Sequence, residues 1–397
     1  MTTALYCPER TNVRKSAGCE EKRSLADGSA LGTWKFSMVF GKESVRYMRV
    51  VFMGTPDFAV GALEAIVEAG HEVTAVVTQP DKPKGRGKEV QMTPVKTCAL
   101  AHDIPVFQPV KIKEPEAVET LRAYGADIFV VAAFGQILSE EILAMPKYGC
   151  VNIHASLLPK YRGAGPIQWA IINGEKITGV TIMQMDKGLD TGDMLFWTEV
   201  GIAPDETADT LHDKLAAVGA GLIVEALAKI EAGGVTPVKQ NDGESCYAKM
   251  LHKSMGKIDW NMEAKKLDCL IRGLISWPGA STVYRGKNLK IWREEVVSEK
   301  ELDVSKAFGG QGETALEAKP KRHGDDIAGN TPSEQDGGGF IRNAAPGTVV
   351  RVDKDAFYVQ TGGGVLKVLE VQPEGKKRMA VKDFLLGYPV KTGDTLV

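Results

Sequence analysis

The sequence predicts a mainly parallel, doubly wound α/β sheet followed by a small β-barrel. Two observations lead to this fold class. From Arg49 to about residue 232, short apolar runs alternate with amphipathic stretches, and strands that alternate with helices are typical of a parallel sheet with helices on both faces. From about residue 256 the chain is rich in Val, Gly and Lys and its apolar runs are short, which suggests a small barrel.

The first domain is expected over residues 48–235. Residues 49–53 are predicted to form a buried strand, and residues 54–57 a turn in which Asp57 is a candidate N-cap for a helix over 58–69. Further strands are expected at residues 72–78, 105–108, 127–134, 150–154, 179–185 and 194–200, and helices at 93–101, 116–124, 166–172 and 207–232. Gly219 and Gly221 leave open a break in the last helix.

The second domain is expected over residues 256–397, after a linker over 236–255. Its short strands are predicted at residues 281–284, 289–292, 348–352, 356–360 and 365–371. Between 298 and 343 the chain is polar and Gly-rich and has too few bulky apolar residues to order itself, which indicates a flexible insertion in a barrel loop. Residues 1–47 have no steady period and no apolar signal-peptide core, so we expect a disordered leader or a start codon placed too early.

The composition limits the possible functions. With 397 residues the chain can hold two domains, and its formal net charge of −2 means that any contact with nucleic acid must come from a local basic patch. The six cysteines are scattered without a C-x-x-C pair, so we expect reduced thiols and no metal site. No apolar run approaches the roughly 18 residues that a membrane helix needs.

Three polar residues, Asn152, His154 and Asp190, are the most informative feature for chemistry. Asn152 and His154 are two positions apart, so on a strand their side chains share one face. An amide donor beside an imidazole suits stabilisation of charge on a reacting carbonyl oxygen, and Asp190 could orient the ring or accept a proton. His154 and the loop that carries Asp190 are both expected at carboxyl ends of strands, where ligands bind in such sheets. A lone histidine at a strand end is more often structural, so this pattern alone leaves both roles open.

The segment SLLPKYRG, residues 156–163, resembles the signature of the enzymes that take a formyl group from 10-formyltetrahydrofolate. Within that family the sequence is most similar to the methionyl-tRNA formyltransferases, through MGTPDFAV (53–60), TQPDKPKGRGK (78–88) and MQMDKGLDTGDML (183–195). The later segments KIDW (257–260), WPGA (277–280) and LEVQPEGKKRM (369–379) fit the same family's second domain, so the resemblance covers most of residues 48–397.

The resemblance implies an OB-like second domain and a catalytic role for Asn152, His154 and Asp190. The implied reaction moves the formyl group of 10-formyltetrahydrofolate to the amino group of initiator methionyl-tRNA for translation initiation, without a metal. No Ser or Cys stands in a nucleophile elbow, so direct acyl transfer is expected. The expected setting is the cytoplasm of a bacterial-type system, with an organelle not excluded, and the expected state is a monomer away from any membrane.

Folate is expected to contact two segments: Phe134, Gly135, Gln136, Ile137 and Leu138, where a buried strand ends, and Ser156, Leu157, Leu158 and Pro159. The first segment would also fit an ordinary strand-to-helix turn. Contacts with tRNA are expected at Lys82, Lys84, Arg86, Lys88, Lys376, Lys377 and Arg378. Solvated surface charge is the alternative for these basic residues.

Two other functions stay open. One is a different formyltetrahydrofolate enzyme that acts on a sugar-nucleotide amine or hydrolyses its donor, which the same three residues would serve. The basic loop and the barrel-like second domain favour tRNA. The other is a non-catalytic RNA-binding protein with a degenerate enzyme domain, against which the intact Asn152, His154 and Asp190 argue.

Overall fold

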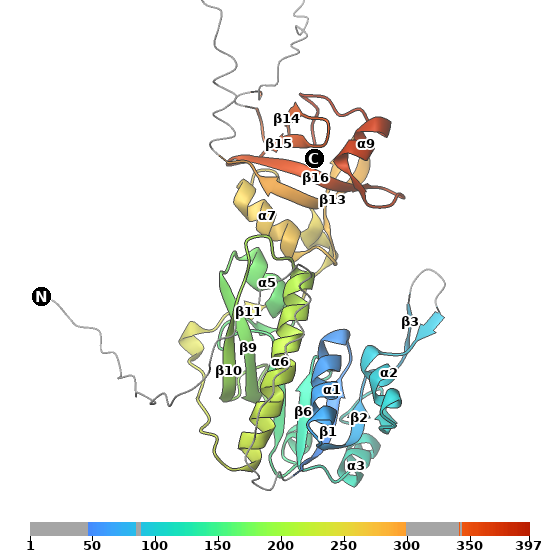
Figure 1. Cartoon of the computed structure of the whole chain (residues 1–397), viewed down its shortest axis with the longest axis vertical. Helices are drawn as coiled ribbons and strands as arrows, with labels where there is room; N and C mark the ends of the chain where they lie inside the picture. Colours follow the sequence, from blue (N-terminus) through green and yellow to red (C-terminus); the bar gives the residue numbers. More distant parts are fainter. Residues whose placement is uncertain (1–46, 85–88, 299–340, 342–343) are drawn as a thin grey trace, which may run out of the picture. The chain divides into compact units, whose positions relative to one another are not determined.

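A computed structural model describes residues 47–84, 89–298, 341 and 344–397 (Figure 1). The predicted leader, apart from Tyr47, and nearly all of the predicted insertion lie outside these residues. So do Arg86 and Lys88 of the basic loop.

The first domain is built on a seven-stranded sheet in the order β10-β9-β7-β6-β1-β2-β5. Its strands are β1 (Arg49–Gly54), β2 (Glu72–Val77), β5 (Val106–Phe107), β6 (Ile128–Ala132), β7 (Cys150–His154), β9 (Ile177–Gln184) and β10 (Met194–Gly201). The five strands from β7 to β5 are parallel, whereas β9 and β10 are antiparallel to their neighbours. The prediction of a mainly parallel sheet is therefore confirmed.

Helices cover both faces of this sheet (Figure 1). The apolar residues of β1 alternate: Val50 and Phe52 face one buried cluster, and Val51 and Met53 face another. The first cluster includes side chains from α1 (Val60–Glu68), α2 (Pro94–Ala101), α5 (Pro166–Ile172) and α6 (Ala208–Glu231). The second includes α3 (Pro115–Ala123) and α4 (Glu140–Leu143). Burial on both faces explains why the parallel strands are continuous apolar runs.

Two local predictions need correction. Asp57 is not the N-cap: Pro56 holds that position before a short 3-10 turn, η1 (Asp57–Ala59), and the Asp57 carboxylate accepts from the backbone N–H of Phe58 at 3.2 Å. α6 has no break at its glycines and runs for 24 residues. Gly219 is buried against β7, where an added Cβ would lie 3.0 Å from Ile153, so this glycine lets the helix approach the sheet closely.

The second domain is an antiparallel sheet in the order β12-β13-β16-β15-β14, with β17 paired to β16. Its strands are β12 (Ala280–Tyr284), β13 (Lys287–Val296), β14 (Val349–Val352), β15 (Phe357–Gln360), β16 (Val365–Pro373) and β17 (Met379–Ala380). The C-terminal residues bridge its two edges, because Leu396 pairs with Tyr284 on β12 and Thr395 pairs with Thr348 beside β14. α7 (Ala264–Gly273) and α9 (Val381–Gly387) contribute to its apolar core. This closure fits the predicted small barrel.

Shorter elements complete the described chain. The basic loop is carried by a hairpin of β3 (Lys82–Lys84) and β4 (Glu89–Gln91). β8 (Arg162–Gly163) pairs with β11 (Tyr247–Ala248), which follows α6 by way of η2 (Asp242–Glu244), and η3 (Lys253–Gly256) precedes the second domain. Within the residues described, no helix combines the length and apolar character needed to cross a membrane.

Candidate active site

An open cavity of about 690 Å³ lies beside the end of β7. Its walls come from the loop after β1, the segment after β6, the last residues of β7 and the loop after β9. β9 runs antiparallel to β7, with Gln184 opposite Val151, so its carboxyl end lies beside the start of β7. The loop after β9 must therefore fold back along β7 to bring Asp190 to His154. The loop lies in the site, as the sequence predicts. The strand before it was expected to be parallel to its neighbours, and it is antiparallel to them.

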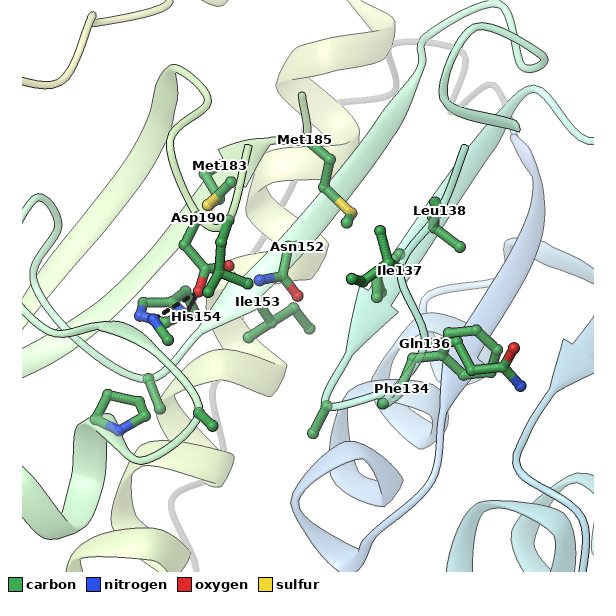
Figure 2. A pocket seen from close by; sticks show the side chains of 18 of the residues that line it. Phe134, Gln136, Ile137, Leu138, Asn152, Ile153, His154, Met183, Met185 and Asp190 are labelled. Atoms are coloured by element: carbon green, nitrogen blue, oxygen red, sulfur yellow. Dashed lines mark hydrogen bonds and ion pairs between the residues drawn. The ribbon is translucent and has the colours of Figure 1, made fainter. Parts of the chain in front are cut away.

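Asn152, His154 and Asp190 come together on one wall of the cavity (Figure 2). The Nδ1 atom of His154 lies 3.8 Å from Oδ2 of Asp190, and the two side chains are only 5% and 15% exposed. Within the described residues, the Asn152 side chain has no hydrogen-bond partner, although it is half-buried. A half-buried amide without a partner is available to a bound molecule.

The backbone fixes which nitrogen of His154 carries hydrogen. Nε2 lies 2.9 Å from the carbonyl oxygen of Tyr161. A carbonyl oxygen can only accept, so Nε2 must donate to it. Nδ1 is then the ring nitrogen left for Asp190 and for a reacting group.

Asp190 is held in an uncommon conformation. Its φ is 55°, in the left-handed region, and its Oδ2 accepts from the backbone N–H of Gly163 at 2.8 Å. The same oxygen faces His154, so one backbone donor sets the position of the carboxylate against the imidazole. Residues in such sparsely populated conformations often mark functional sites, where surrounding contacts hold them in place.

Cys150, at the start of β7, is not a candidate nucleophile. Its thiol is fully buried, and burial raises its pKa to about 12. A thiol with so high a pKa stays protonated near neutral pH and is a poor nucleophile. Direct transfer without a covalent enzyme intermediate stays a prediction.

The segment from Phe134 to Leu138 forms the opposite wall (Figure 2). Ile137 is 74% exposed and offers an apolar surface to the cavity. Phe134 is buried, and its carbonyl oxygen accepts from Thr55 and Gln79. The Gln136 amide is also occupied, because it accepts from the N–H of Ile112 and donates to the Pro109 carbonyl. Both residues line the cavity, and their contact with folate stays a prediction.

The second predicted folate segment, Ser156, Leu157, Leu158 and Pro159, is not part of the cavity lining. Ser156 is fully buried and its hydroxyl donates to the Lys160 carbonyl at 2.7 Å. Thr181 on β9 donates to the Ser156 carbonyl and accepts from the Leu158 N–H. The segment is a fixed turn between His154 and Tyr161, and its contact with folate stays a prediction.

Comparison with known proteins identifies the family. The formyl transferase family matches residues 48–227, and the formyl transferase C-terminal domain matches residues 250–389. A methionyl-tRNA formyltransferase of Agathobacter rectalis is 51% identical over 87% of this chain and 98% of its own length. One of Caldanaerobacter subterraneus is 46% identical over 88% of this chain and all of its own length. The chain belongs to the methionyl-tRNA formyltransferase family.

Solved structures support the fold of this formyltransferase. HypX from Aquifex aeolicus in complex with tetrahydrofolic acid has a TM-score of 0.53 at 16% identity, over 89% of this chain and 51% of its own. A sugar 3N-formyl transferase has the same TM-score at 18% identity, over 84% of this chain and all of its own. At these identities the similarity concerns the fold alone.

The predicted tRNA-binding residues of this formyltransferase differ in their surroundings. Lys82 is exposed at the base of the β3–β4 hairpin, and Lys376 and Lys377 are exposed in the turn between β16 and β17. Arg378 is already engaged, because it pairs with Glu370 and its guanidinium lies 5.0 Å from the ring centre of Trp292. The two lysines are therefore freer than Arg378 to meet a phosphate.

Sequence reasoning missed three residues that build the site. Tyr161 supplies the carbonyl that fixes His154, Gly163 supplies the donor to Asp190, and Gln240 donates to the loop that carries Asp190. Tyr161 and Gly163 lie inside the SLLPKYRG segment and act through backbone groups, which side-chain identity does not reveal. Gln240 is 50 residues from Asp190 in sequence and no motif marks it.

Proposed function

We propose that Asn152, His154 and Asp190 carry out, in this chain, the transfer of a formyl group from 10-formyltetrahydrofolate to the amino group of methionyl-tRNA. The observation that carries the proposal is the free amide of Asn152 beside the His154–Asp190 pair in an open cavity. An amide donor aimed at a reacting oxygen is worth about 3 kcal/mol when it meets the charge that develops there.

The reaction needs no group beyond those that line the cavity. The methionyl nitrogen attacks the formyl carbon, a C–N bond forms, and the carbonyl oxygen becomes an oxyanion. The Asn152 N–H faces this oxygen and donates to it. Because Nε2 of His154 already donates to the Tyr161 carbonyl, Nδ1 can donate to the oxyanion only from the doubly protonated ring, whose charge the Asp190 carboxylate faces. Asp190, directly or through a water, accepts the proton that the amine loses. The bond from the formyl carbon to N10 of the folate then breaks, and N10 takes up a proton.

The donor folate would lie along the wall that Ile137 exposes, with its formyl group toward Asn152. The wall is mostly apolar and the opposite side carries the three polar residues, which suits a flat ring system held by a few directed hydrogen bonds. Holding donor and acceptor together in this geometry would supply much of the remaining rate.

The methionyl-tRNA would meet the chain at Lys82, Lys84, Arg86 and Lys88 of the hairpin loop and at Lys376, Lys377 and Arg378. We propose the domain division predicted from the sequence: a catalytic domain over 48–235, a linker over 236–255 and a tRNA-binding domain over 256–397. We also propose that the enzyme works as a monomer in the cytoplasm.

Incubation with donor labelled in its formyl group, and with a panel of acceptors, tests the function. We expect label in methionyl-tRNA and none in free methionine or in an amino-sugar nucleotide. Label in the sugar nucleotide would reassign the acceptor, and release of formate in buffer alone would indicate a hydrolase. Binding of tRNA without any transfer would point to a non-catalytic RNA-binding protein.

A further inference from the structure

One buried side chain outside the catalytic trio ties the active-site loop to the segment after α6. Gln240 is 6% exposed, and its amide nitrogen donates to the carbonyl oxygens of Asp190 at 2.9 Å and of Gly192 at 2.7 Å. Both acceptors lie in the loop between β9 and β10. A single side chain therefore fixes the backbone of Asp190 itself and of its near neighbour.

The other end of the same amide holds the strand that binds the Asp190 carboxylate. The Gln240 oxygen accepts from Nε of Arg162 at 2.9 Å, and Arg162 also pairs with Asp242 at 2.8 Å. Arg162 precedes Gly163, whose N–H donates to the carboxylate of Asp190. Gln240 thus connects the backbone that carries the catalytic carboxylate with the backbone that orients it.

The loop needs such support because Asp190 has a left-handed φ of 55°. Residues with a Cβ adopt this conformation at a cost, smaller for Asp than for most, which neighbouring contacts compensate. The bond from Gln240 to the Asp190 carbonyl is a contact of this kind. It is part-buried, and the companion bond to the Gly192 carbonyl is buried, so water does not replace the pair readily. The segment is further anchored where Val238 pairs with Met194 at the start of β10.

We propose that Gln240 is a positioning residue for formyl transfer, which sets the Asp190 carboxylate against His154. The proposal rests on the catalytic role proposed above for Asp190. Gln240 itself does not line the cavity, so it acts through Asp190 and not on the substrates. Without its two donated bonds the carboxylate would drift from His154, and a misplacement of about 1 Å can lower a rate on the order of 100-fold.

Two substitutions separate position from folding. Gln240→Met keeps the side chain's length and removes every hydrogen bond. Gln240→Asn keeps the amide and withdraws it by one methylene, so it should lose less activity, and it keeps the test available if Gln240→Met fails to fold. The matched control is Gln360→Met, because the Gln360 amide also donates to two backbone carbonyls, those of Thr361 and Gly364, in the second domain.

The deciding experiment measures kcat and both KM values in the parent chain and in an Asp190→Asn background. We expect Gln240→Met to lower kcat on the order of 100-fold in the parent, with little change in KM for donor or methionyl-tRNA, and to cost nothing further beside Asp190→Asn. Residues that act as a unit are not additive in this way. Gln360→Met should leave kcat unchanged in both backgrounds.

The inference is overturned if Gln240→Met and Gln240→Asn keep the parental kcat, or if their loss is equally large in both backgrounds. A general loss of folding would lower the thermal midpoint and affect both backgrounds alike. Parental activity of Asp190→Asn alone would instead overturn the proposed role of Asp190. This measurement involves no Gln240 variant, so the two failures can be told apart.

Discussion

Glu294, on β13, gives the sharpest prediction of stability. Its side chain is 8% exposed, and its Oε2 atom has no hydrogen-bond partner in the described part of the chain. Burial raises the pKa of this carboxyl from 4.5 to about 8, the Asp268 carboxylate adds to the rise, and Arg272 opposes it. Arg272 is itself paired with Asp268 at 2.6 Å, so the Asp268 carboxylate offsets much of the effect of the Arg272 charge on Glu294.

The direction of the pH effect follows from the proton count. Between pH 4.5 and about 8 the folded chain keeps a proton on Glu294 that the unfolded chain has lost. The contribution of the Glu294 proton to stability is therefore fully present below the unfolded-state pKa, and it is lost as the pH rises through the folded-state pKa. At 1.36 kcal/mol for each pKa unit, a rise from 4.5 to about 8 sets an upper limit of about 5 kcal/mol.

Glu294→Gln removes the titration and keeps the shape. Only the parent should lose stability of the second domain as the pH rises. We therefore expect the free energy of unfolding of the variant minus that of the parent to grow by at least about 2 kcal/mol between pH 5 and pH 8.5. Urea denaturation at five pH values measures it. Glu295→Gln is the control, because it removes the same charge from the next residue, which is exposed and paired with Lys367. A difference between Glu294→Gln and the parent that does not change with pH would refute the reasoning.

Two further predictions concern function and the start of the chain. Neutralising Lys84 and Arg86 together should raise KM for methionyl-tRNA but not for the folate. It should also lower the slope of log affinity against log salt concentration by roughly 0.7–0.9 for each phosphate that the loop no longer neutralises. Kinetics across a salt series measure both, and a parental KM and slope would assign the loop to solubility alone. A chain that starts at Met48 should keep its activity and thermal midpoint, since residues 1–47 show no core-forming period; a markedly lower midpoint would mean that they pack on the folded domain.

Much of the fold could be predicted from the sequence because its signals are local. The alternation of apolar and amphipathic stretches predicts the parallel strands β1, β2, β6 and β7, which are buried on both faces. The antiparallel direction of β9 could not be predicted, because a short apolar run gives the same sequence pattern whether the strand is parallel or antiparallel to its neighbour. Gly219 suggested a break in α6. In the structure the helix is continuous, and the absence of a side chain at Gly219 lets α6 pack closely against β7.

The proposed catalytic side chains were easier to identify than the contacts that place them. Asn152, His154 and Asp190 differ in chemistry from the apolar runs around them, and a known family has the same pattern. The carbonyl of Tyr161 and the N–H of Gly163 are groups that every residue of their kind possesses, so only the folded backbone gives them a role. Gln240 looks like any polar linker residue until the loop between β9 and β10 closes on it.

The single-turnover rate of formyl transfer to methionyl-tRNA in the Asn152→Ala variant tests the central claim most directly. The free amide of Asn152 is the proposed donor to the oxyanion, so its removal should slow the transfer step by about 10²–10³-fold while the donor folate still binds. Asn261→Ala, which removes an exposed amide bonded to Asp259 in the second domain, should transfer at the parental rate. A near-parental rate in Asn152→Ala would contradict the account, because the cavity would then stabilise the oxyanion without the residue on which the mechanism depends.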